Sequence, residues 1–210
     1  MKKRKREQSA SASTLRWGHT REEVGKTKGG ARSARVEARA LKSWEGLVTR
    51  YTSTFRRFAS ETPADGTVCV VEIGSSTGQS SRLLFERVGG DRLLCLDTSK
   101  ELVEQCATSE SMPAELRKCF VRCDVLMEPA RVLSRCAKLI KENKKVRGLL
   151  ISVDIGGNRE LGPVLSVIRF LSERVAPLAA GLGCSLSVLV KSESLHMEAG
   201  CAASAAVLES

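Results

Sequence analysis

The chain has 210 residues, of which 42% are hydrophobic, and a net charge of +10. This length and composition suffice for one domain with a buried core, and the absence of an apolar run of 18 residues predicts no membrane span. The charge is uneven. Residues 1–50 hold 14 Lys and Arg against 5 Glu, a balance of +9, whereas the other 160 residues hold 20 against 19, a balance of +1.

Residues 1–34 are polar, rich in Ser, Ala, Gly and basic residues, and have no apolar period. They are predicted to form a basic disordered tail. A basic arm on a near-neutral domain is typical of sequence-independent binding to nucleic acid, so RNA is an expected partner, with a protein substrate or partner as the alternative. The run Lys2–Arg6 fits a nuclear-import signal. We therefore expect an intracellular protein, nuclear or nucleolar, although the serine- and arginine-rich start also fits an organellar address.

Apolar residues recur at three- and four-residue intervals between about Ala34 and Ala59. This period predicts one or two helices within residues 35–62 that pack on the sheet before its first strand. From residue 67 onward, short apolar runs alternate with helical patterns. The predicted strands are 67–73, 92–96, 118–122, 148–153 and 185–190. The predicted helices are 79–88, 100–108, 129–141, 161–180 and 193–209.

This alternation predicts an α/β fold with a doubly wound, mainly parallel sheet and helices on both faces. In such sheets ligands bind beyond the carboxyl ends of the strands. Several glycine and charged residues stand just past a predicted strand end, and they form the candidate site: Gly74, Gly78, Asp97, Asp124, Asp154 and Lys191.

The first strand runs into the sequence Glu72-Ile-Gly74-Ser-Ser-Thr-Gly78, a G-x-x-x-G turn with an acid two residues before it. A dinucleotide fingerprint would require glycine at Ser76. Asp97 ends the second strand 23 residues after Gly74 (97 − 74), close to the interval of about 20 expected for an acid that binds a ribose. The alternative is that the glycines only form a tight turn and allow the following helix to pack.

This pattern resembles the class I, Rossmann-like S-adenosylmethionine (SAM)-dependent methyltransferases. The resemblance implies a methyltransferase-like domain over residues 35–210, with an N-terminal helical lid at 35–62 and a Rossmann-like core at 67–192. It also implies a SAM site in which the turn lies under the methionine part of the cofactor, Asp97 accepts from the ribose hydroxyls and Asp124 accepts from the adenine amino group. For Asp124 a helix cap or a surface turn is the alternative. The cofactor-binding residues implied are Glu72, Gly74, Ser75, Ser76, Gly78, Asp97, Thr98 and Asp124.

Asp154 and Lys191 end the fourth and fifth predicted strands. They are similar to the acid and one lysine of the Lys-Asp-Lys-Glu tetrad of 2′-O-ribose RNA methyltransferases, with Lys42 as the candidate for the first lysine. The resemblance implies that Lys191 accepts the proton of a ribose hydroxyl and that Asp154 holds it in place. The Asn/Asp-Pro-Pro-Tyr motif of base-amino methyltransferases is absent. The alternative is a salt bridge that only neutralises a strand-end carboxylate.

Two departures leave other functions open. The family sheet has seven strands that end in a reversed hairpin, whereas five strands and no closing hairpin are predicted here. An inactive methyltransferase-like module that binds RNA or protein is therefore an alternative. A nicotinamide-dependent reductase is disfavoured because its Tyr-x-x-x-Lys pair is absent and Tyr51 is the single tyrosine. Eight cysteines without a C-x-x-C pair, and two histidines, predict reduced thiols and no metal site.

Overall fold

The computed structural model describes residues 44–49, 52–155 and 161–196. Its centre is a six-stranded sheet in which every neighbouring pair is parallel, in the order β1-β6-β5-β2-β3-β4. The strands are β1 (Trp44–Thr49), β2 (Val68–Ile73), β3 (Leu93–Asp97), β4 (Phe120–Arg122), β5 (Gly148–Val153) and β6 (Ser185–Lys191).

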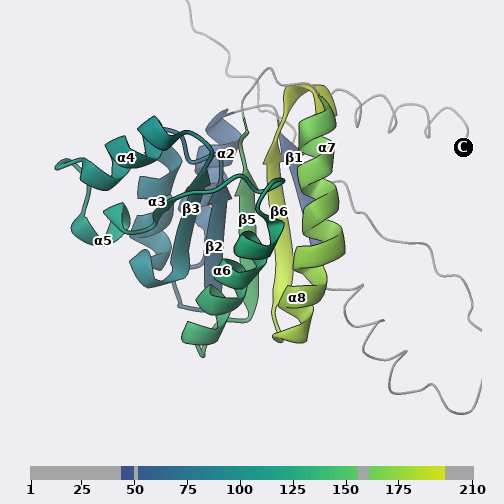
Figure 1. Cartoon of the computed structure of the whole chain (residues 1–210). Helices are drawn as coiled ribbons and strands as arrows, with labels where there is room; N and C mark the ends of the chain where they lie inside the picture. The colour runs from purple at the N-terminus through teal and green to yellow at the C-terminus, as the bar shows by residue number, and fades with distance from the viewer. Residues whose placement is uncertain (1–43, 50–51, 156–160, 197–210) are drawn as a thin grey trace, which may run out of the picture.

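Helices cover both faces of this sheet (Figure 1). The helical elements are α2 (Thr52–Glu61), α3 (Gln79–Val88), η1 (Gly90–Arg92), α4 (Lys100–Thr108), α5 (Ala114–Arg117), α6 (Pro129–Glu142), α7 (Leu161–Phe170) and α8 (Ala176–Gly181). Helices α6, α7 and α8 pack on one face and α2, α3 and α4 on the other. This is a doubly wound, Rossmann-like α/β arrangement, as the alternating pattern predicts.

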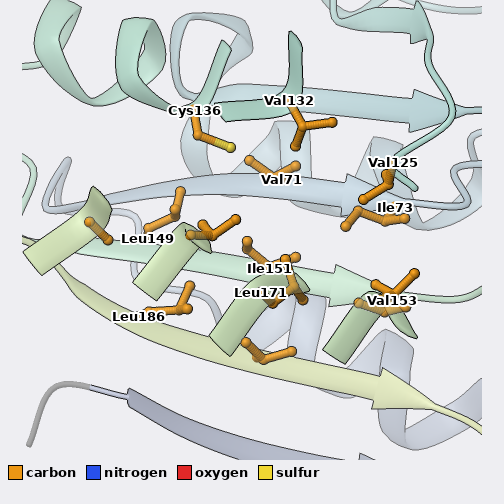
Figure 2. Close-up of a cluster of buried hydrophobic side chains, with 14 of the residues drawn as sticks. Val71, Ile73, Val125, Val132, Cys136, Leu149, Ile151, Val153, Leu171 and Leu186 are labelled. Atoms are coloured by element: carbon orange, nitrogen blue, oxygen red, sulfur yellow. The ribbon is translucent and has the colours of Figure 1, made fainter. Parts of the chain in front are cut away.

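The two faces have separate cores. On one face Val71, Ile73 and Ile151 of the sheet meet Val132 and Cys136 of α6, and Figure 2 shows these side chains interdigitating. On the other face the strands contribute alternate residues to a second cluster under α2 and α3. The strands β2 and β5 are buried at five of six positions each, as expected for a parallel sheet covered on both sides.

Helix boundaries follow local sequence signals. The Ser99 hydroxyl accepts from the Leu102 amide (3.2 Å) and caps α4, and Pro129 begins α6. The sequence predicts one continuous helix over 161–180. In the structure, a π-helical turn at Leu171–Val175 separates α7 from α8. Pro177 follows this turn after one residue, Ala176, and its nitrogen cannot donate the hydrogen bond that an α-helix needs there.

The prediction of helix throughout 34–59 is wrong for Trp44–Thr49. These residues form β1, which pairs with β6 along its whole length from Trp44↔Leu186 to Thr49↔Lys191. Their i, i+3, i+4 spacing fits a helix, but Gly46, Val48 and Thr49 are weak helix formers, and an open sheet edge offers hydrogen bonds that a local pattern cannot report. Helix α2 confirms the prediction over 52–59, and residues 34–43 lie outside the described part.

The sheet thus has one strand more than predicted, and that strand precedes the others in the chain. Helix α2 joins β1 to β2 by crossing β6 and β5 on the face that also carries α3. Within the described residues no strand follows Lys191, and the prediction of a helix at 193–209 falls mostly on residues that are not described.

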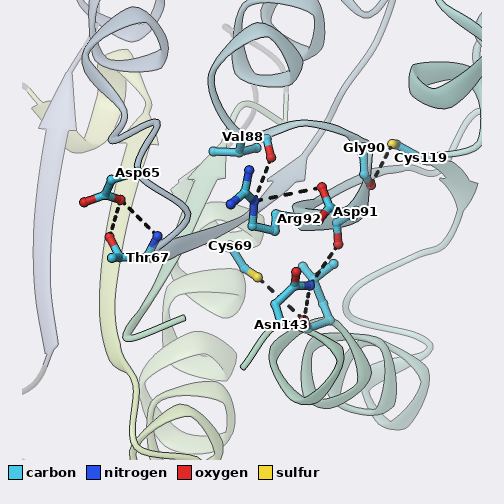
Figure 3. A network of polar contacts seen from close by, with 10 residues as sticks. Asp65, Thr67, Cys69, Val88, Gly90, Asp91, Arg92, Cys119 and Asn143 are labelled. Atoms are coloured by element: carbon cyan, nitrogen blue, oxygen red, sulfur yellow. Dashed lines mark hydrogen bonds and ion pairs between the residues drawn. The ribbon is translucent and has the colours of Figure 1, made fainter. Parts of the chain in front are cut away.

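At the amino-terminal end of the sheet, a polar network joins the loops before β2, β3 and β5 (Figure 3). Arg92 donates to the Val88 carbonyl (2.7 Å) and lies 3.9 Å from the Asp91 carboxylate. The Asn143 amide donates to the carbonyl of Asp91 (3.0 Å), which ties the end of α6 to the start of β3. These contacts hold the base of the sheet together.

The seven described cysteines are free and buried; Cys201 lies outside the described residues. Burial raises the pKa of Cys69 and Cys136 to about 12, so these thiols stay neutral and act as small apolar side chains. Among the described helices, none is long and apolar enough to cross a membrane. The described part also holds no cluster of three or more potential metal ligands.

Candidate functional site

The glycine turn lies at the carboxyl end of β2, between β5 and β3. From β2 the chain adds β3 and β4 on one side, and later β5 and β6 on the other. Doubly wound sheets bind ligands at the point where the strand order reverses in this way. The turn is fixed by its own backbone: the amides of Gly74 and Ser75 both donate to the Leu96 carbonyl (2.8 and 3.1 Å), and the Gly78 amide donates to the Ser75 carbonyl (2.9 Å).

Both glycines are required by packing inside the protein. Gly74 and Gly78 have φ of +84° and +74°, which disfavours side chains. A Cβ on Gly74 would lie 2.0 Å from the Asp154 carbonyl oxygen, and one on Gly78 would lie 2.8 Å from the Met112 side chain. The G-x-x-x-G pattern is therefore explained by the turn itself, so the case for a ligand must come from other residues.

Asp97 ends β3 and faces the glycine turn. Its Oδ2 accepts from the Ser76 amide (2.8 Å), and its Oδ1 accepts from the Ser99 amide (2.9 Å). An ionised carboxylate offers about four acceptor positions, so two remain for a ligand. The carboxylate is half-buried, and the neighbouring Thr98 is exposed. The predicted ribose acid and the turn thus form one continuous surface.

Glu72 does not reach this surface. Its side chain is buried under α3, where its Oε2 accepts a hydrogen bond from the Ser81 hydroxyl. Burial raises the pKa of Glu72 to about 8; the Ser81 hydrogen bond opposes this rise, and the nearby Asp154 carboxylate adds to it. The carboxyl group therefore packs beneath the glycine turn. Because it is buried, it cannot contact the methionine part of a cofactor in this structure, contrary to the prediction.

Asp154 and Lys191 meet at the ends of β5 and β6. The Lys191 ammonium lies 2.8 Å from Asp154 Oδ2, and both side chains are about three-quarters to four-fifths buried. Asp154 is also tied to the turn, because its amide donates to the Ile73 carbonyl (2.8 Å). The predicted pairing is confirmed as an ion pair. Its geometry fits the simple neutralisation of a carboxylate as well as a role in catalysis.

Asp124 is bound to its own loop. Its Oδ1 accepts from the amides of Leu126 (2.9 Å) and Met127 (3.1 Å), which is the surface-turn role given above as the alternative. The loop lies beside Asp97, because the Cys123 amide donates to the Asp97 carbonyl (2.9 Å). The Met127 side chain is 80% exposed next to this edge. An adenine contact through Asp124 Oδ2 stays a prediction.

The structure adds residues that the sequence pattern does not reveal. The α3 helix begins in the glycine turn, and no side chain caps its N-terminus. Arg56, on α2, donates to the Gln79 Oε1 at this end (2.6 Å), although it lies 23 residues away in the chain. The buried Ser75 hydroxyl has no hydrogen-bond partner. An uncapped helix start, an arginine and an unpartnered hydroxyl together suit an anionic group.

The site residues are ordered across the sheet as Lys191, Asp154, Gly74, Asp97 and Asp124, at the ends of five adjacent strands. The Asp154–Lys191 pair and Asp97 therefore lie on opposite sides of the glycine turn. With a strand spacing of about 4.8 Å, β6 and β3, which are three strands apart, are separated by roughly 15 Å. Lys42 and the residues that follow Asp154 at 156–160 lie outside the described part.

Two surface hollows, of about 220 and 380 Å³, lie at the opposite end of the sheet, near Asp91 and Lys118, and neither includes a predicted site residue. Comparisons of the chain with protein-family models, curated proteins and solved structures find no match.

Proposed function

We propose that this protein binds SAM at the carboxyl edge of its sheet and transfers the methyl group to a macromolecular substrate, most directly RNA. The main support for cofactor binding is the Asp97 carboxylate. It accepts a hydrogen bond from the Ser76 amide of the glycine turn and has further acceptor positions for a ligand. The class I methyltransferase resemblance rests on the same residues. The basic segment 1–50 supports RNA as the substrate.

The residues present fit the cofactor at both of its ends. Asp97 would accept from the ribose hydroxyls, and the start of α3 with Arg56 would hold the carboxylate of the methionine part. The unpartnered Ser75 hydroxyl offers one further donor. When bound, SAM would supply an electrophilic methyl group.

Methyl transfer mainly requires alignment of donor and acceptor and exclusion of water. On the far side of the turn from Asp97, the Lys191 ammonium and the Asp154 carboxylate would orient the acceptor group of the substrate through hydrogen bonds. This assignment needs no nucleophilic side chain, in keeping with a described part that holds seven buried, neutral thiols.

Asp97→Ala is expected to weaken binding of S-adenosylhomocysteine, the demethylated product of SAM, by about 100-fold. The reason is the loss of two hydrogen bonds to a charged acceptor, each contributing roughly 1.5 kcal/mol. Isothermal titration calorimetry of both proteins measures this change, with NADPH as a ligand that should give no heat. No binding of SAM or its product to the unaltered protein would contradict the proposal, as would heat with NADPH alone.

The matched control is Asp65→Ala at the opposite end of the sheet. Asp65 Oδ1 accepts from the Thr67 amide (2.9 Å), as Asp97 Oδ1 accepts from the Ser99 amide, so both changes remove the same kind of local turn contact. Thermal unfolding of the two variants separates a loss of the site from a loss of the fold. Equal weakening of binding in both variants would count against a direct role for Asp97.

Arg56→Ala is expected to weaken binding of S-adenosylhomocysteine about tenfold, while binding of 5′-methylthioadenosine, which lacks the carboxylate, stays unchanged. A charge-assisted hydrogen bond of roughly 1.5 kcal/mol gives this factor. The matched control is Arg57→Ala, because Arg57 is the exposed neighbour that pairs with Glu61 (2.7 Å) on the outer side of α2. Calorimetry with both ligands measures the contrast. Equal losses for the two ligands would show that Arg56 acts only through the position of α2.

A second candidate is a binding module without methyl transfer, and one observation favours it. The parallel strand β1 lies beside β6, where the resemblance places a reversed closing hairpin. Incubation of the protein with radiolabelled SAM and total RNA distinguishes the two functions. Label in the RNA supports transfer, whereas cofactor binding without label supports the module.

A further inference from the structure

The amino-terminal end of the sheet, opposite the candidate site, carries a basic loop, which comprises the last two residues of α6 and the connection to β5 (residues 141–147). Lys141, Lys144, Lys145 and Arg147 are exposed there, with Glu142 as the single acid. Glu142 pairs with Lys138 on the preceding helical turn (3.7 Å), and none of the four cations forms an ion pair with a described residue. The loop therefore presents four uncompensated positive charges.

The backbone of this loop is held in place. The Arg147 guanidinium donates to the carbonyls of Lys144 (3.2 Å) and Val146 (2.8 Å), and the Arg147 amide donates to Thr67 (2.7 Å). At the other end of the loop, Asn143 bridges to Asp91, as Figure 3 shows. A fixed backbone lowers the entropy lost when a partner binds.

The basic N-terminal segment enters the fold at the same end. Trp44, the first residue of β1, is in register with Leu186, which in turn is in register with Leu149, the second residue of β5. Because β1 lies two strands from β5, the segment joins the sheet roughly 10 Å from the end of the basic loop.

The charges of the two regions account for the whole surplus of the chain. Residues 1–43 hold 13 Lys and Arg against 4 Glu, a balance of +9, and the loop 141–147 holds 4 against 1, a balance of +3. Their sum of +12 exceeds the net +10, so the remaining residues carry −2. At the carboxyl edge three aspartates, Asp97, Asp124 and Asp154, follow the strand ends. Among the described residues, the positive loop 141–147 thus lies at the amino-terminal end of the sheet and the three aspartates at the carboxyl end.

We propose that the basic loop 141–147 binds the phosphate backbone of RNA, next to the entry of the basic N-terminal segment and away from the candidate cofactor site. This inference rests on the RNA part of the proposed function. Because β5 spans six residues, or roughly 20 Å, an RNA anchored at the loop must extend along the side of the domain before it reaches Asp154 and Lys191. The surface recognises the backbone and carries no sequence preference of its own.

The test compares two double variants of the full chain with equal charge loss. Lys144→Gln with Lys145→Gln changes the loop. Arg169→Gln with Arg174→Gln removes two exposed cations from α7 and the π-helical turn after it, where Arg169 forms only an exposed ion pair with Glu173. Fluorescence anisotropy with a labelled single-stranded RNA is measured over a series of KCl concentrations. For the loop variant, we expect about tenfold weaker binding near physiological salt and a salt slope smaller by about 1.4, the value for two lost phosphate contacts.

The Arg169/Arg174 variant should keep both the affinity and the salt slope of the unaltered protein within about twofold. Equal weakening of the two variants would overturn the inference, because binding would then depend on net charge alone. It would also be overturned if the unaltered protein bound vesicles containing phosphatidylserine but did not bind the RNA. Calorimetry of the Lys144/Lys145 variant with S-adenosylhomocysteine keeps this outcome separate from a failure of the cofactor site, because the loop change leaves that site intact.

Discussion

Glu72→Gln is expected to make the protein more stable than the unaltered chain at pH 9, and nearly equal in stability at pH 5. The ordinary pKa of a glutamate is 4.5, whereas burial raises that of Glu72 to about 8. Between these values the folded protein holds a proton that the unfolded chain has released. The free energy of unfolding therefore falls as pH rises through this window and levels off above it.

The size of this effect follows from the pKa difference. The rise from 4.5 to about 8 corresponds to roughly 4 to 5 kcal/mol of unfolding free energy. Glutamine has nearly the same shape, accepts from the Ser81 hydroxyl and does not ionise, so its variant should lack this part of the pH dependence. Urea denaturation followed by circular dichroism from pH 4 to pH 9 measures the difference.

The control for this experiment is Glu86→Gln, an exposed glutamate on the same helix, α3. Its stability profile should run parallel to that of the unaltered protein. If the Glu72 variant ran parallel as well, the buried carboxyl would not be protonated in the folded state, and the role of Glu72 as a neutral support beneath the turn would be wrong.

Gly74→Ala is expected to lower the free energy of unfolding by about 3 kcal/mol or more. The left-handed conformation at φ +84° costs a side chain roughly 1 to 2 kcal/mol. In addition, the new Cβ would lie 2.0 Å from the Asp154 carbonyl oxygen and 2.7 Å from its carbon, so the end of β5 must move. That movement would break the Asp154–Ile73 hydrogen bond, which contributes about 1 kcal/mol.

The matched control is Gly181→Ala at the end of α8, where a Cβ would meet no atom within 4 Å apart from its chain neighbours. In a helix this change should stabilise the protein slightly, by up to about 1 kcal/mol. Chemical denaturation of both variants gives the comparison. A Gly74 variant as stable as the Gly181 variant would show that the carboxyl ends of β2 and β5 are not packed as tightly as the structure has them.

Elements with strong local signals could be predicted closely from the sequence. The bounds of α3, α4 and β5 agree with the prediction residue for residue, because glycines, the Ser99 cap and a continuous apolar run mark their ends. Strand β1 could not be predicted in this way. Its pairing with β6 joins residues more than 140 positions apart, and the hydrogen bonds of a sheet edge leave no periodic trace in the sequence.

The candidate site also contains residues that could be predicted from the sequence and residues that could not. Residues at the carboxyl ends of strands, such as Asp97 and Asp154, could be placed at one edge because parallel strands share their direction. Arg56 could not, since its contact with Gln79 depends on how α2 crosses the sheet. The burial of Glu72 could not be predicted either. The E-x-G-x-x-x-G pattern includes this residue but does not show that its side chain packs beneath α3.

The sequence by itself determined the alternation of strands and helices, the glycine turn and the order of acids at the strand ends, because these depend on backbone preferences and apolar periods within about 20 residues. The tertiary structure alone decided which strand forms the sheet edge beside β6, that Glu72 is buried, and that the basic loop 141–147 lies beside the start of β1. These features arise from contacts between distant segments, and local sequence carries no record of which segments will meet.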